Sequence, residues 1–68
     1  MSDSRNYFIE LGGVTAAHRA QSILESNSIK SRTGKISTPS GCSWGVYVEM
    51  RKKDEAALLL RASSVKIL

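Results

Sequence analysis

Cysteine, histidine and proline each occur only once in the 68 residues, and their scarcity excludes several kinds of site. A single thiol cannot form an intramolecular disulfide, and one cysteine with one histidine cannot hold a tetrahedral zinc ion. A soft-metal site of the copper-chaperone kind needs more than one soft ligand, which a single chain does not offer. We therefore expect neither a bound metal nor another cofactor.

The sequence also lacks a long apolar run. No stretch approaches the roughly 20 apolar residues of a membrane-spanning helix. Residues 1–5 have neither the basic nor the apolar region of a signal peptide. Because a free thiol suits a reducing compartment, we expect a cytoplasmic protein with no membrane partner.

The chain is short and moderately basic, with ten Lys and Arg against six Asp and Glu. A chain of this length buries only about 60% of its unfolded surface, so a homodimer would add stability. The basic residues are dispersed, and the longest run, Arg51-Lys52-Lys53, is followed at once by Asp54-Glu55. This dispersal favours a solvated surface over an electrostatic docking site for an anionic partner.

Hydrophobic periodicity predicts six elements after a disordered polar tail over residues 1–5. Strands are expected at 6–11, 29–36, 43–50 and 65–68, with helices at 16–27 and from about 55 to 62. Thr15 is the expected cap of the first helix and Asp54 that of the second. The order predicts one ferredoxin-like α+β domain over residues 6–68, with both helices on one face of a four-stranded antiparallel sheet. The expected strand order is fourth, first, third, second.

This topology predicts a helix start beside the single cysteine. Cys42 follows the turn over residues 37–41, at the sheet edge where the first helix is expected to begin. A helix N-terminus presents unpaired N–H groups and a partial positive charge, and both favour a thiolate. Glycines let backbone donors approach an anion closely. The residues expected to support the Cys42 thiolate are Gly12, Gly13, Thr15, His18, Lys35 and Gly41.

His18 is the one candidate base for Cys42, in the manner of a cysteine–histidine pair. Its place at the border of the apolar stripe fits a surface histidine equally well. No third residue is evident to orient the imidazole, which argues against a hydrolase or protease. A buried, inert Cys42 is the alternative to a reactive one. We expect a carrier or binding module rather than a turnover enzyme.

Three stretches carry a family resemblance: YFIEL at residues 7–11, AQSIL at 20–24, and TPSGC at 38–42, which leads into a strand. In these stretches and in the expected two-helix, four-strand layout, residues 7–68 resemble the selenium/sulfur carrier protein-like family of small bacterial proteins. The resemblance implies that Cys42 carries sulfur or selenium as a persulfide or selenosulfide. It also implies protein partners, a donor that loads the thiol and an acceptor that unloads it.

Two other functions use the sheet face away from the helices, where Phe8 and Tyr47 are expected on adjacent strands. RNA-recognition domains stack bases on aromatic residues placed in this way. Glu10 and Glu49 share that face, however, and the glycine-aromatic signature of those domains is missing. The same face could instead be an apolar dimerisation patch of Phe8, Tyr47 and Leu68. In a plain interaction module, Cys42 would be incidental.

Overall fold

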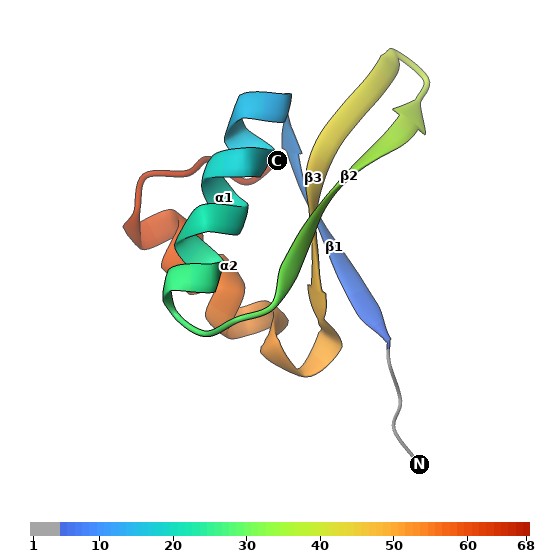
Figure 1. Ribbon diagram of the computed structural model, residues 1–68. Helices are drawn as coiled ribbons and strands as arrows, with labels where there is room; N and C mark the ends of the chain where they lie inside the picture. The colour runs from blue at the N-terminus through green and yellow to red at the C-terminus, as the bar shows by residue number, and fades with distance from the viewer. Residues whose placement is uncertain (1–4) are drawn as a thin grey trace.

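The computed structural model describes residues 5–68, an α+β fold with one three-stranded antiparallel sheet (Figure 1). The strands lie in the order β1-β3-β2, and both helices cover one face of the sheet, leaving the other face open. The elements are β1 (Asn6–Gly12), α1 (Val14–Ser26), β2 (Ser31–Thr38), β3 (Gly41–Glu49), the 3-10 helix η1 (Met50–Lys52) and α2 (Lys53–Ala62).

The predicted four-stranded ferredoxin-like sheet is wrong, because residues 65–68 do not form a strand. The Val65 N–H donates to the carbonyl of Leu60 at 2.8 Å, so this donor completes the end of α2. The Leu68 N–H donates to the carbonyl of Glu10 at 3.0 Å, and within residues 5–68 this is the backbone bond that joins the segment to β1. One bond does not make an antiparallel ladder. The expected order of the first three strands agrees with the observed one.

The hydrophobic core lies between the helices and the covered face of the sheet. Ile9 in β1 and Val46 and Val48 in β3 are buried on this face, as the sequence pattern predicts. Gly45, on the opposite face, is also buried, beneath the Phe8 ring. The helices and the segments after them add Ala20, Leu24, Ile29, Ala56, Leu60 and Val65 to this cluster. Burial of an aliphatic side chain of this size contributes about 1.5–3 kcal/mol.

Both helices begin earlier than their predicted caps. Gly13 is the N-cap of α1, with φ −115° and ψ 156°, and its carbonyl accepts the Ala17 N–H at 3.1 Å. The predicted Thr15 cap is therefore wrong, and Thr15 lies inside the first turn. α2 likewise begins at Lys53, which places Asp54 in its first turn rather than at its cap.

The two helices end in the same hydrogen-bonded motif. Ser28 and Ser64 adopt left-handed φ values of 63° and 65°. The next residues, Ile29 and Val65, are buried and donate their N–H groups back into the helices. This is a Schellman ending, in which glycine usually takes the left-handed position.

The predicted tail over residues 1–5 falls mainly outside the described residues. At its end, the carbonyl of Arg5 accepts the Met50 N–H at 3.1 Å. No helix within residues 5–68 is long and apolar enough to cross a membrane.

Candidate functional site

Cys42 lies on the arm of a β-hairpin. β2 and β3 extend further than predicted, with only Pro39 and Ser40 between them, so Cys42 belongs to β3 and pairs with Ser37. Gly41 takes a φ of 132° at the end of the turn, a value that glycine adopts readily. The hairpin projects past the end of β1 and beyond both helices (Figure 1). The thiol is therefore exposed and unbridged.

The start of α1 lies at the same end of the sheet as Cys42, but the tip of the hairpin extends beyond it. Gly12 pairs with Trp44, and Cys42 is two residues further along β3, or about 7 Å of strand. Within residues 5–68 the Cys42 sulfur makes no hydrogen bond, so the expected contact with the N–H groups near Gly13 is not formed. The overhang of the hairpin separates the thiol from the helix N-terminus.

A cation and an aromatic ring, Lys35 and Trp44, lie close to Cys42 on the hairpin arm. They pair across the two strands, and the Lys35 Nζ lies 5.7 Å from the centroid of the indole ring. Such a cation–π contact holds the ammonium near the aromatic face. Because alternate residues of a strand share a face, Cys42, Trp44 and Lys35 lie on one face of the hairpin, with Lys35 diagonal to Cys42. Lys35 was expected near Cys42 from the sequence and Trp44 was not, although its position two residues after Cys42 in a predicted strand could have indicated it.

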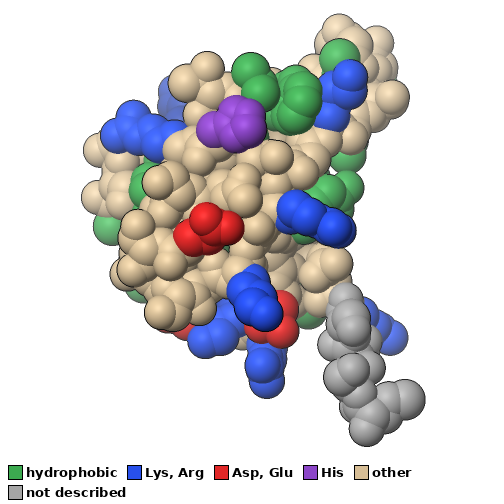
Figure 2. All heavy atoms as spheres, viewed as in Figure 1, with side chains coloured by type: hydrophobic (Ala, Val, Ile, Leu, Met, Phe, Trp, Pro, Cys, Tyr) green, Lys and Arg blue, Asp and Glu red, His purple; other side chains and the backbone are tan. Residues whose placement is uncertain are grey.

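The predicted pair of Cys42 and His18 is not formed within the described residues. His18 and Thr15 are exposed on α1, and neither makes a recorded hydrogen bond to the thiol. The imidazole, purple in Figure 2, lies at the molecular surface. In residues 5–68 no group of three or more His, Cys, Asp or Glu side chains could hold a metal ion. Among residues 5–68, the Cys42 thiol therefore makes no hydrogen bond to a base.

On the open face of the sheet, Phe8 and Tyr47 are direct neighbours, as the sequence suggested. Their ring centroids lie 4.8 Å apart with an interplanar angle of 54°. Each ring also covers a glycine: a Cβ at Gly45 would meet the Phe8 ring, and one at Gly34 would meet the Tyr47 ring. Aromatic residues commonly fill the space over strand glycines, so these two have a packing role in the sheet. Leu68 lies beside Gly12, and it lines a hollow at the outer edge of β1 together with Phe8.

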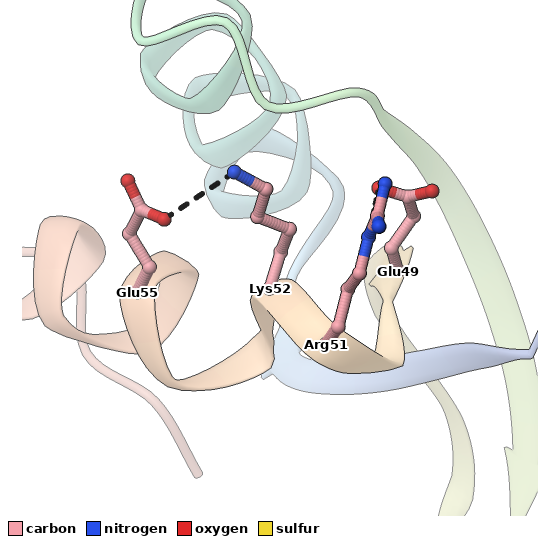
Figure 3. Close-up of polar contacts among 4 residues, drawn as sticks. All are labelled: Glu49, Arg51, Lys52 and Glu55. Atoms are coloured by element: carbon pink, nitrogen blue, oxygen red, sulfur yellow. Dashed lines mark ion pairs between the residues drawn. The ribbon is translucent and has the colours of Figure 1, made fainter.

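The longest basic run is balanced by neighbouring acids (Figure 3). Arg51 pairs with Glu49 and Lys52 with Glu55, each at 3.6 Å. Lys53 also pairs with Asp54, at 3.4 Å. On the face seen in Figure 2, basic side chains are spread out, and several of them lie near the lower end beside acidic ones. Exposed pairs contribute only about 0–1 kcal/mol, so their main effect is to lower the local positive charge.

Within residues 5–68, the hairpin arm presents an exposed thiol on the same face as the ammonium of Lys35 and the indole of Trp44. Comparison with protein-family models, with curated proteins and with solved structures finds no match to the chain.

Proposed function

We propose that the protein is a sulfur or selenium carrier and that the Cys42 Sγ is the carrier atom. The observation that carries the proposal is the exposure of this thiol on a hairpin arm that projects from the body of the domain (Figure 1). A carrier must be reached by a donor and then by an acceptor, so its thiol has to stand clear of its own helices. It needs no pocket for a large substrate, which suits a domain of 68 residues.

The transfer is a thiol exchange in which no net oxidation occurs. The Cys42 thiolate attacks the outer sulfur of a donor persulfide, R–S–SH. The bond between the two donor sulfurs breaks, the donor leaves as the thiolate R–S⁻, and Cys42 becomes Cys42–S–SH. An acceptor thiolate then attacks the outer sulfur and releases the Cys42 thiolate. Selenium follows the same course through a selenosulfide.

Lys35 supports the reactive form of the thiol in this proposal. It lies diagonal to Cys42 on the same face of the hairpin, and its ammonium is held over Trp44. A nearby cation stabilises a thiolate, the form that attacks sulfur. Trp44 adds an apolar surface against which a partner protein can pack.

The test uses glutathione persulfide as the donor and intact-mass spectrometry as the readout. We expect the native protein to gain the mass of one sulfur atom, which a small thiol removes, and the Cys42→Ser variant to gain none. A peptide of residues 36–48, which holds the same cysteine without the fold, is the reference for the rate. Loading of the folded protein should be faster than loading of the peptide, and Lys35→Gln should slow it towards the peptide rate.

Equal loading rates for the folded protein and the peptide would contradict the proposal, because the fold would then do nothing for the thiol. The protein isolated from cells without reductant should also carry sulfur or selenium on Cys42. A cellular function that survives Cys42→Ser would favour the interaction module. Binding of RNA that weakens steeply with salt and is lost on Tyr47→Ala would favour the nucleic-acid alternative.

A further inference from the structure

The outer edge of β1 is open over most of its length. β1 is at one side of the sheet, with β3 as its neighbour on the inner side. Among residues 5–68, only the Leu68 N–H bonds to this outer edge, at the carbonyl of Glu10. An open strand edge presents backbone donors and acceptors that readily pair with another strand.

The hydrogen-bond alternation identifies which backbone groups are open. Met50 donates to the carbonyl of Arg5, the residue just before β1. Because the bonding direction alternates along the strand, residues 7 and 9 of β1 also direct their N–H and C=O groups towards β3. Residues 6, 8 and 10 then direct theirs outward, in agreement with the bond that Glu10 accepts from Leu68. The unused groups are the N–H and C=O of Asn6 and Phe8 and the N–H of Glu10.

Apolar side chains flank this edge on its helix side. Tyr7 is 42% exposed and Leu58 is 68% exposed. Both line a hollow of about 340 Å³ between β1 and α2. Exposed apolar side chains gathered beside an unpaired strand edge are typical of a protein interface.

Five α2 residues line this hollow: Lys53, Asp54, Ala57, Leu58 and Arg61. The Lys53 ammonium lies 5.5 Å from the centroid of the Tyr7 ring and 3.4 Å from the Asp54 carboxylate. The other four residues form a self-complementary stripe, because their spacing of i, i+3, i+4 and i+7 places them on one helix face. An acid begins the stripe, a base ends it, and small and large apolar residues lie between. A two-fold axis through the midpoint between Ala57 and Leu58 would place a second α2 antiparallel to the first. Asp54 of each copy would then face Arg61 of the other.

We propose that β1 and α2 form a two-fold interface with a second copy of this chain. The axis passes near Tyr7, which lies in the same hollow as the midpoint of the stripe. The two β1 strands pair antiparallel, with Asn6 of each copy opposite Phe8 of the other, and four backbone hydrogen bonds join them. The α2 helices then meet, Leu58 against Ala57 and Asp54 against Arg61. A closed, isologous dimer is the commonest assembly of identical chains, and this one continues the sheet to six strands.

This interface leaves the hairpin arm with Cys42 accessible. Cys42 lies beyond the Gly12 end of the sheet, whereas the axis lies near Tyr7, at the other end of β1. The proposal therefore does not depend on carrier chemistry, and each can fail without the other.

Charge reversal in mixed samples tests the proposed register. Sedimentation equilibrium should show that the native chain dimerises. Asp54→Arg and Arg61→Asp, each alone, place like charges opposite one another and should raise the dissociation constant at least about tenfold. An equimolar mixture of the two variants should dimerise again, because each base then faces an acid. Arg19→Asp, which makes the same change on the exposed surface of α1, is the matched control and should leave the constant unchanged.

The strand pairing is tested without a substitution, by amide hydrogen exchange in the native chain. Exchange at Asn6 and Phe8 should slow as the protein concentration rises, while exchange at the exposed Lys66 should not change. A native chain that stays monomeric at about 1 mM overturns the proposal. The proposal is also overturned if the mixture of the two variants fails to dimerise, or if neither charge reversal changes the dissociation constant. It is overturned as well if amide exchange at Asn6 does not depend on protein concentration. Any of these results would mean that a second copy of this chain does not pair with the outer edge of β1.

Discussion

Replacement of Gly45 by alanine should destabilise the fold more than the same change at Gly34. The two glycines pair across β2 and β3, with Gly45 in the central strand and Gly34 in an edge strand. A Cβ at Gly45 would meet the backbone carbonyl of Ile9 and lie 2.7 Å from the Phe8 Cζ. For a Cβ at Gly34, the three nearest atoms all belong to the Tyr47 ring. A ring can turn away, but the Ile9 carbonyl belongs to the ladder between β1 and β3.

The magnitude follows from two opposed effects. At an unobstructed strand position, alanine is better than glycine by about 0.5–1 kcal/mol, because glycine loses more backbone entropy. Overpacking that shifts a backbone costs about 1–3 kcal/mol or more. The clash at Gly45 is with backbone, so the upper part of this range applies; after subtraction of the alanine gain, Gly45→Ala should lower the free energy of unfolding by roughly 1–2.5 kcal/mol. At Gly34 the cost is an off-rotamer Tyr47, about 0.5–1.5 kcal/mol, which the alanine gain largely offsets.

Urea unfolding followed by far-UV circular dichroism measures both effects. With a slope of about 1 kcal/mol per M, Gly45→Ala should lower the urea midpoint by roughly 1–2.5 M and Gly34→Ala by less than about 1 M. Double variants separate the causes. Tyr47→Ala should remove the cost of Gly34→Ala, whereas Phe8→Ala should leave most of the cost of Gly45→Ala. A Gly45→Ala protein as stable as the native one would refute the reasoning.

Three further substitutions should stabilise the protein, and thermal or urea unfolding can check each of them. Ser28→Gly and Ser64→Gly relieve left-handed serines at the two helix ends, so each should add about 0.5–1 kcal/mol; a loss of stability would contradict the Schellman assignment. Ser43→Ala removes a buried hydroxyl that has no hydrogen-bond partner within residues 5–68, and it should add about 1 kcal/mol. A loss instead would mean that the hydroxyl is hydrogen-bonded in solution.

Much of the core could be predicted because its signals are local. Strict alternation in β1 and β3 assigns Ile9, Val46 and Val48 to the buried face. The same alternation places Phe8 and Tyr47 together on the opposite face. The helix ends near Ser28 and Ser64 also follow from the local sequence, although serine is a weaker stop signal than glycine.

The conformation of residues 65–68 could not be predicted from their apolar pattern. The Val65 N–H can either begin a strand beside β1 or complete the end of α2, and in the structure it donates to Leu60. Which acceptor receives a given donor depends on how helix and sheet are packed together. The pattern predicts a strand in either case, so the fourth strand was wrongly expected.

The sequence by itself determined that the protein has one thiol, that it follows a turn, and that a lysine and a tryptophan lie close to it in the chain. Only the tertiary structure decided where that thiol lies. β2 and β3 extend beyond the end of β1, so Cys42 lies past the start of α1 and not in contact with it. The packing of α2 beside β1 likewise brings Tyr7 to the stripe of Asp54 and Arg61. Strand length, register and helix placement are set by pairings between distant segments, and a local periodicity carries no information about them.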